Sequence, residues 1–232
     1  MTNPTPSVLE QKRVLIACES SQVVTKAFRD LGFDAYSCDI LPGEINKDWH
    51  IQKDIRDVDL LDYDMVGSHL PCTFMCNSGV SWLHKDETRW KELQKSNELF
   101  HYFWQSGVKH LYIENPIPHK YALLPKYSQI IQPYQFGHTE RKATCLWLKN
   151  LPLLKESNNV KDEMDKLPKS QSQRIHYASP GKDRWKVRSR TFTGIAEAMA
   201  NQWKNILLNE LDKEVKQQKI EENVCFVAGK KK

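Results

Sequence analysis

Short apolar runs alternate with segments of helical periodicity from the beginning of the chain. The first run covers 13–18 and ends in the polar group 19–22. Apolar residues then recur at helical spacing over 23–31 and stop at Gly32, a residue that favours the end of a helix. This pattern predicts a buried strand, a turn and a helix, followed by a second short strand over 34–38.

The same alternation continues through the rest of the chain. Further strands are predicted over 50–55, 64–69, 110–113 and 143–148, and helices over 90–106 and 194–211. Strands and helices that alternate in this way are typical of a mostly parallel sheet with helices on both faces. A chain of 232 residues suffices for one such domain. We therefore predict an α/β fold with a doubly wound, mostly parallel sheet.

Acidic and thiol side chains stand where the predicted strands end. Glu19, Asp39, Asp54, Cys72 and Glu114 each follow a predicted strand. Loops at the carboxyl ends of parallel strands converge on one crevice, so we expect these side chains to surround it. A strand, a helix and a second strand that ends in an acid are also how nucleotide-binding α/β domains begin. Capping of loops by Asp39 and Asp54 is the alternative interpretation.

Cys72 follows a proline and begins a polar loop, where a thiol can be exposed in a crevice and act as a nucleophile. Carbon 5 of cytosine accepts a methyl group only after a thiolate has added to carbon 6. That addition needs an acid near ring nitrogen 3, and Glu114 is suitably placed. Two alternatives stay open, namely a buried structural thiol and a zinc site formed by Cys72 and Cys76 with His69 or His84.

Several short motifs, which follow one another along the chain in the family's order, resemble those of the cytosine carbon-5 DNA methyltransferases. Residues 70–72 (Leu-Pro-Cys) are similar to the family's Pro-Cys nucleophile motif, and 114–116 (Glu-Asn-Pro) to its Glu-Asn-Val motif. The segment 14–24 is similar to the first motif, which holds the methionine part of S-adenosylmethionine. The segments 134–148 and 194–203 resemble the arginine-containing motif and the closing helix. The chain looks most like the small phage- and prophage-encoded members.

This resemblance implies a Rossmann-like, S-adenosylmethionine-dependent methyltransferase that acts on cytosine in DNA, with the base flipped out of the helix. It implies catalytic roles for Cys72, Glu114 and Arg141. Pro71, Asn115 and Lys142 are implied to bind the substrate. The cofactor-binding residues that it implies are Ala17, Glu19, Ser20, Asp39, Ile40, Asp54 and Ile55.

Two features depart from the family's pattern. The turn 19–22 reads Glu-Ser-Ser-Gln where the family has glycines, so we expect the backbone to approach the cofactor less closely. We also expect the separate target-recognition domain to be absent or reduced to the basic connection 151–190. Within that connection, 166–190 carries eight basic residues and one acidic residue. This excess favours a nucleic-acid partner, although a solvated basic loop has the same composition.

Composition and charge add little to this picture. The chain is 40% hydrophobic and 27% charged with a net charge of +5, values typical of a globular protein. It has no apolar run long enough for a membrane span and no secretory signal, so we expect a cytoplasmic protein whose six cysteines form no disulfides. We expect a flexible N-terminus over 1–12, one methyltransferase-like domain over 13–211 with the basic insertion, and a charged tail over 212–232. No metal and no obligate protein partner are expected.

Two functions from different classes fit these observations. The first is methylation of carbon 5 of cytosine in DNA, with an enzyme that modifies free pyrimidine nucleotides as a variant. The second is a non-catalytic nucleic-acid-binding module on a degenerate methyltransferase fold, which the altered turn 19–22 and the basic segment favour. Titration with the cofactor separates the two, because only the enzyme requires it.

Overall fold

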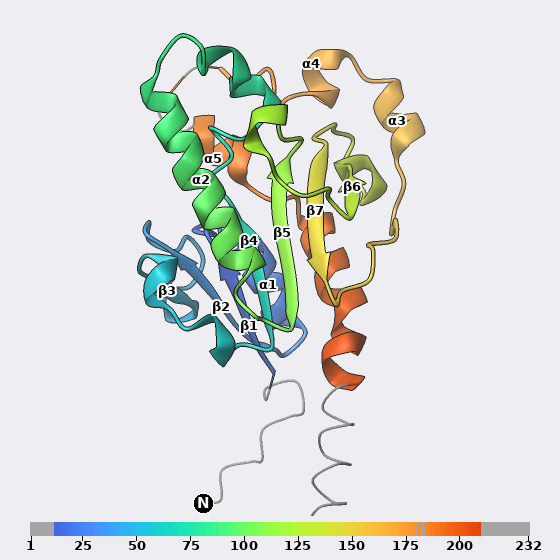
Figure 1. The fold of residues 1–232 in the computed structure, drawn as a ribbon. Helices are drawn as coiled ribbons and strands as arrows, with labels where there is room; N and C mark the ends of the chain where they lie inside the picture. The colour runs from blue at the N-terminus through green and yellow to red at the C-terminus, as the bar shows by residue number, and fades with distance from the viewer. Residues whose placement is uncertain (1–11, 180, 182–183, 210–232) are drawn as a thin grey trace, which may run out of the picture.

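Seven strands form one sheet in the computed structural model, which describes residues 12–179, 181 and 184–209 (Figure 1). The strands are β1 (Arg13–Ala17), β2 (Asp34–Asp39), β3 (His50–Gln52), β4 (Met65–His69), β5 (His110–Pro116), β6 (Gln129–Ile131) and β7 (Thr144–Lys149). The helices are α1 (Val23–Asp30), α2 (Thr88–Trp104), α3 (Lys161–Asp165), α4 (Lys169–Ser172), α5 (Arg184–Ser189) and a C-terminal helix over 193–209. Short 3-10 helices lie in the connections at Lys47–Trp49, Ile55–Asp57, Leu60–Asp62, Asn77–Trp82, Lys120–Ala122 and Pro133–Gln135.

The strand order is β3-β2-β1-β4-β5-β7-β6. Strands β1 to β5 pair in parallel, and β7 runs antiparallel to both of its neighbours. The prediction of an α/β fold with a mostly parallel sheet is confirmed. The order reverses between β1 and β4, and open α/β sheets bind ligands outside the carboxyl ends of the strands at such a point.

Helices cover both faces of the sheet, as predicted. Successive residues of a strand point to opposite faces, so β1 sends Ile16 towards one hydrophobic cluster and Leu15 towards another. The first cluster contains Phe28 of α1 and Trp203 of the C-terminal helix. The second contains Phe100 of α2, which runs along the near face in Figure 1. The buried core therefore consists of two layers, one on each side of the sheet.

The structure differs from the sequence prediction at several boundaries. Strand β5 continues to Pro116, so Glu114 lies within the strand rather than after it. Strand β3 ends at Gln52, and the residues that follow form a 3-10 helix rather than more strand. Strand β6 was not predicted, because it has three residues and one of them, Ile130, is 37% exposed. On α2, Trp90 is 38% exposed, whereas Phe103 is fully buried.

The connection 151–190 is not one loop. It contains the short helices α3, α4 and α5, and it buries Leu154, Met164 and Ile175. The predicted terminal segments fall almost entirely outside the described residues. Within the described ranges, no helix is long and apolar enough to cross a membrane.

We predict that Gly67→Ala destabilises the protein. A Cβ at Gly67 would lie 2.1 Å from Cε1 of Tyr112, whose fully buried ring crosses β4 at this position. Overpacking of this kind typically costs about 1–3 kcal/mol of the free energy of unfolding, measured by urea denaturation. The control is Gly181→Ala, because no atom lies within 4 Å of the added Cβ there. Equal stabilities of the two variants would contradict the packing argument.

Candidate active site

The parallel register of β4 and β5 places His69 directly beside Glu114. Nδ1 of His69 lies 3.0 Å from Oε2 of Glu114, and the two side chains are only 8% and 12% exposed. The other ring nitrogen, Nε2, lies 2.8 Å from the hydroxyl of Tyr112. The hydroxyl of Thr191 approaches Nδ1 at 3.2 Å. His69 is therefore held on both of its ring nitrogens at the carboxyl ends of the strands.

His69 and Glu114 each favour the charged form of the other. Burial is the largest single influence on both groups, and it acts against charge in each case. The hydrogen bond and the charge of Glu114, with help from Glu19, nevertheless raise the pKa of His69. The hydrogen bond and the charge of His69, with help from Lys142, lower the pKa of Glu114. Both shifts favour a buried imidazolium–carboxylate pair.

The loop after β4 holds Cys72 in a tight turn that is tied to the loop after β5. The carbonyl of Cys72 accepts hydrogen bonds from the main-chain N–H groups of Met75 (3.2 Å) and Cys76 (3.1 Å). His119 donates its main-chain N–H to the carbonyl of Met75 (2.9 Å), and its Nε2 lies 2.8 Å from the carbonyl oxygen of Phe74. The position of Cys72 is thus set by two loops together.

The thiol of Cys72 is kept protonated in this arrangement. The hydrogen bond with Cys76 raises the pKa of Cys72 most, followed by burial and by the negative charge of Glu114. The ammonium group of Lys142 acts in the opposite direction. The sequence led us to expect thiolate character, and the contact with Cys76 works against it.

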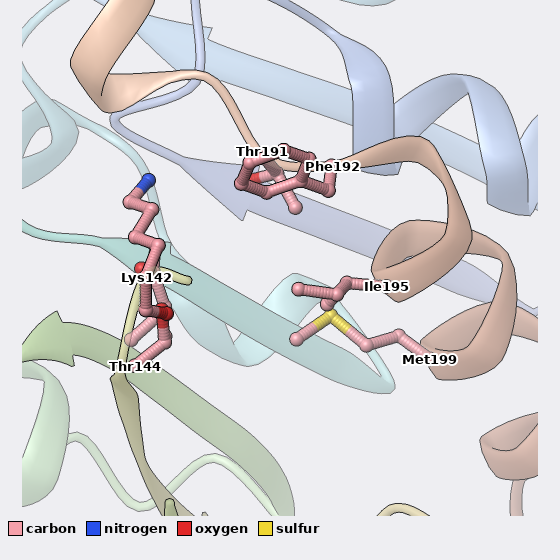
Figure 2. Close-up of a pocket in the computed structure, with 7 residues that line it drawn as sticks. Lys142, Thr144, Thr191, Phe192, Ile195 and Met199 are labelled. Atoms are coloured by element: carbon pink, nitrogen blue, oxygen red, sulfur yellow. The ribbon is translucent and has the colours of Figure 1, made fainter. Parts of the chain in front are cut away.

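A small pocket lies beside Glu114, between the sheet and the C-terminal helix (Figure 2). Its walls are Glu114, Lys142, Thr144, Thr191, Phe192, Ile195 and Met199. The space between them is about 10 Å³, roughly what one water molecule requires. In this conformation the pocket has no room for a pyrimidine base.

Of the two neighbouring basic residues proposed to contact the base, Lys142 lines the pocket and Arg141 does not. Arg141 forms an ion pair with Asp165 of α3 on the surface. The amine of Lys142 lies 3.5 Å from the carbonyl of Arg190. Lys142 is therefore placed to act on the site, and Arg141 would have to leave Asp165 to do so.

The turn between β1 and α1 is built around Glu19. Its buried carboxylate accepts hydrogen bonds from the main-chain N–H groups of Val24 (2.7 Å) and Thr25 (3.1 Å) and from the Thr25 hydroxyl (2.7 Å). Burial raises the pKa of Glu19 against these bonds. Cys18 and Gln22 take left-handed backbone conformations, with φ of 58° and 56°. Two residues other than glycine thus make this sharp turn, while Glu19 caps α1.

The loop after β2 is fastened to this same turn. Oε1 of Gln22 accepts from the main-chain N–H groups of Ile45 (2.7 Å) and Asn46 (2.8 Å), and its Nε2 donates to the carbonyl of Asn46 (2.8 Å). The main-chain N–H of Glu44 donates to the carbonyl of Ser20 at 2.9 Å. Gln22, which the sequence gave no reason to single out, therefore joins the ends of β1 and β2.

Asp39 and Asp54 both cap loops, but they differ in whether a carboxylate oxygen is left without a hydrogen bond to the described residues. Oδ1 of Asp39 accepts from the main-chain N–H two residues on, at 2.9 Å, while its second oxygen has no hydrogen-bond partner among the described residues. Both oxygens of Asp54 bind Arg56, and these hydrogen bonds lower the pKa of Asp54 to about 2. Of their neighbours, Ile40 is 70% exposed and Ile55 is buried in the core.

The remaining predicted residues lie around the same edge of the sheet. Ala17 is buried at the end of β1, and Pro71 is exposed beside Cys72. Asn115 is fully buried and donates to the carbonyl of Pro116 at 2.7 Å, while its Oδ1 has no partner in the described part of the chain. Side chains alternate along a strand, so Asn115 points to the opposite face of β5 from Glu114.

The zinc alternative needs three or more ligands that converge. Across the ranges that the structure describes, no three His, Cys, Asp or Glu side chains are grouped so that they could hold a metal ion. His84, one of the ligands considered, packs edge-on against the rings of Trp90 and Tyr121.

Ion pairs anchor the basic segment 166–190 at Arg174 and at Arg190. Arg174 pairs with Glu140 at 2.8 Å, and Arg190 pairs with Glu44 of the loop after β2. Between these anchors α5 presents Trp185, which is 47% exposed, with the amine of Lys186 over its ring. The segment therefore approaches the carboxyl ends of the strands.

Sequence reasoning considered His69 only as a zinc ligand and missed Tyr112 and Thr191. One signal for His69 was present, because it ends an apolar strand three residues before Cys72. Nothing in the local sequence marks Thr191 or Tyr112, since their contacts depend on tertiary packing.

We predict that Glu114→Gln lowers the pKa of His69, measured by NMR titration of its ring, because the variant removes the charge opposite a buried imidazolium. In the wild type the pair stabilises the fold until the pH rises through the raised pKa of His69 or falls through the lowered pKa of Glu114. The variant should lose the alkaline decline in the free energy of unfolding. His138 is the internal control, since burial lowers its pKa and Glu114 takes no part. An unchanged His69 titration would contradict the ion pair.

No protein-family model and no curated protein matches this chain. Among solved structures, a match is found to an E. coli protein encoded within a prophage and described as a candidate DNA modification methyltransferase. The two share 14% sequence identity, with a TM-score of 0.39. The match covers 68% of this chain and 55% of that one. A likeness of this size does not bear on the function.

Proposed function

We propose that this protein methylates carbon 5 of cytosine in DNA through covalent addition of Cys72 to the base. The observation that carries the proposal is the meeting of a thiol, a carboxylate and an ammonium group at one edge of the sheet. Cys72, Glu114 and Lys142 come from three separate segments. The charge of Glu114 raises the pKa of Cys72, and the charge of Lys142 lowers the pKa of both other groups. The ordered motifs that resemble the cytosine carbon-5 methyltransferases support the same assignment.

Each of the three residues has a distinct task in this reaction. The thiolate of Cys72 forms a bond to carbon 6 of the cytosine ring, which makes carbon 5 nucleophilic. Glu114 provides the acidic group beside ring nitrogen 3, where negative charge develops during that addition. Lys142 favours the thiolate form of Cys72, against the contact with Cys76. S-adenosylmethionine, when bound, supplies an electrophilic methyl group.

The residues at the ends of β1 and β2 fit the cofactor in part. The unengaged oxygen of Asp39 suits a ribose hydroxyl. The left-handed residues Cys18 and Gln22 allow a sharp turn there without glycine. Asp54 would first have to release Arg56. Asp39 is therefore the acid that we assign to the cofactor.

Entry of a base requires the pocket beside Glu114 to widen. Figure 2 shows that the side chains of Lys142, Phe192 and Met199 come from different segments around it. The flexible side chain of Lys142 can leave without disturbing the core, whereas Met199 is fully buried. We assign the opening to Lys142 and to the segment 191–192, which follows the basic helix α5.

DNA is the polymer that the charge distribution suits. The segment 166–190 carries eight basic residues against one acidic residue, and Arg190 lies close enough to the site for its carbonyl to contact Lys142. A phosphate backbone held by this segment would bring a flipped base towards Glu114.

A non-catalytic nucleic-acid-binding module is the second candidate function. Two features favour it, namely the contact with Cys76 that raises the pKa of Cys72 and the small volume of the pocket beside Glu114. Such a module would bind DNA without any need for cofactor or thiolate, so the two predictions below separate it from the enzyme.

The first prediction is that S-adenosylmethionine binds the protein and that Asp39→Ala weakens this binding, measured by titration calorimetry. Loss of one charge-assisted hydrogen bond corresponds to about 1.5–3 kcal/mol. The matched control is Asp34→Ala, because Asp34 lies on the same strand at the opposite end and pairs with Arg29. The affinity of Asp34→Ala for S-adenosylmethionine should equal that of the wild type. Folded wild-type protein that gives no heat with millimolar cofactor would exclude the cofactor assignment.

The second prediction is a covalent complex with DNA that carries 5-fluorocytosine at the target position. Fluorine leaves no proton on carbon 5 to be removed, so the adduct with Cys72 persists in the presence of the methyl donor and shifts the protein on a denaturing gel. Cys72→Ser should form no adduct while its cofactor affinity is retained. Cys76→Ser keeps the nucleophile and should still form it. If Cys72→Ser and Cys76→Ser lose the adduct equally, and the protein binds zinc in stoichiometric amount, a metal site is favoured instead.

A further inference from the structure

We propose that His69 is the proton reservoir of the site and delivers its proton through Glu114 to ring nitrogen 3 of the target cytosine. This inference rests on the proposed function and adds a positioning residue to it. The geometry that points to it is a three-member chain in which Tyr112, His69 and Glu114 follow one another in hydrogen-bond contact, with Glu114 at the pocket.

Glu114 stands between His69 and the pocket. Its Oε2 faces Nδ1 of His69 at 3.0 Å, whereas Oε1 has no hydrogen-bond partner in the described structure. One oxygen is thus engaged and the other remains to meet a base. A carboxylate used in this way can take a proton on one oxygen and give one from the other.

Glu114 needs such a supply because it has no proton of its own. The charge and the hydrogen bond of His69 lower the pKa of Glu114, against its burial, so the carboxylate form prevails. A carboxylate can accept a hydrogen bond from a base but cannot protonate ring nitrogen 3. His69 is the neighbour that carries a transferable proton on the nitrogen facing Glu114.

The surroundings of His69 favour its protonated form from several sides. Glu114 of β5 and Glu19 of the turn after β1 both raise its pKa, while Lys142 before β7 lowers it, and burial opposes the charge. The hydroxyl groups of Tyr112 and Thr191 contact its two nitrogens. Two carboxylates against one ammonium group leave an excess of negative charge around the ring.

The enclosure keeps this proton from exchanging freely with solvent. Tyr112 is fully buried and its ring crosses β4 at Gly67, a position where any Cβ would collide with it. The imidazole is therefore shielded on the sheet side and opens towards Glu114. Among the described residues, the carboxylate of Glu114 and the hydroxyl of Thr191 face Nδ1, and of these two the carboxylate is the stronger proton acceptor.

The proton transfers accompany a shift of electron pairs through the cytosine ring. Cys72 first releases its thiol proton to water. When the resulting thiolate bonds to carbon 6, the π pair of the carbon 5–carbon 6 bond moves to carbon 4–carbon 5, and the π pair of the carbon 4–nitrogen 3 bond moves onto nitrogen 3. Nitrogen 3 takes a proton from Glu114, which takes one from Nδ1 of His69, leaving a neutral imidazole. The carbon 4–carbon 5 pair then forms the new bond at carbon 5, and the pair on nitrogen 3 restores the carbon 4–nitrogen 3 double bond. Carbon 5 next loses its proton to water, the C–H pair re-forms the carbon 5–carbon 6 double bond, and the thiolate leaves with the carbon–sulfur pair. Nitrogen 3 returns its proton through Glu114 to His69.

The test measures the exchange of the hydrogen on carbon 5 of cytosine in DNA for solvent deuterium, with the demethylated cofactor product present in place of the methyl donor. Exchange needs the addition of Cys72 and protonation of nitrogen 3, but no methyl transfer. In the wild type its rate should fall as the pH rises through the pKa of His69, because the neutral pair has no proton to deliver.

His69→Gln keeps a polar side chain beside Tyr112 and Glu114 but cannot carry the proton. We expect it to slow exchange on the order of 100-fold, to remove the alkaline decline, and to leave DNA affinity unchanged. The control is His101→Gln, because His101 lies on α2, which packs on the other face of the sheet. It should keep both the rate and the pH profile of the wild type.

The outcomes separate the inference from the function on which it rests. Wild-type protein that catalyses neither exchange nor adduct formation would exclude the proposed function itself. If the wild type is active and His69→Gln exchanges the hydrogen on carbon 5 at the same rate, with the same decline at alkaline pH, only the role of His69 is overturned. Should that variant fail to fold, the nitrogen NMR spectrum of wild-type His69 decides. Both ring nitrogens protonated at neutral pH support the proposal, and a neutral ring overturns it.

Discussion

The register between β4 and β5 determines the geometry of the whole candidate site. It pairs Gly67 with Tyr112 and His69 with Glu114, all on the face covered by α1 and the C-terminal helix. Because side chains alternate along a strand, a slip of one residue would turn Glu114 to the face of α2 and separate it from His69. The glycine allows the tyrosine ring to lie across β4, and the tyrosine hydroxyl then orients the imidazole. Packing in the core and charge at the edge are thus set together.

The loops at this edge differ in how firmly they are held. The turn after β1 is fixed by the buried side chains of Glu19 and Gln22, and the loop of Cys72 is fixed by His119. Buried hydrogen bonds of this kind are costly to break, so these segments form a rigid frame. Lys142 and the segment 191–192 close the pocket with fewer such ties. Movement that admits a ligand is therefore expected from them rather than from the strands.

The alternation of short apolar runs and helical periodicity was enough to predict β1, α1, β2, β4 and α2, because each buries a continuous face. The same pattern brought Cys72 and Glu114 to one edge, since strand ends converge in a parallel sheet. It failed for β6, whose three residues carry too little signal. It also missed the pair of His69 with Glu114, because the two are 45 positions apart and their contact depends on register.

Arg141 and Lys142 show why neighbouring residues cannot be told apart from sequence when one of them serves a site. Asp165 of α3 captures Arg141 on the surface, and Lys142 is left facing Glu114. The presence of a lysine rather than an arginine beside Glu114 has an electrostatic consequence. The charge of Lys142 also acts on Cys72, where it favours the thiolate against the charge of Glu114. An arginine held in its place would carry the same charge on a bulkier, planar group that binds carboxylates through two hydrogen bonds. It would compete with His69 for Glu114, whereas a lysine can support the nucleophile and leave the proton pathway intact.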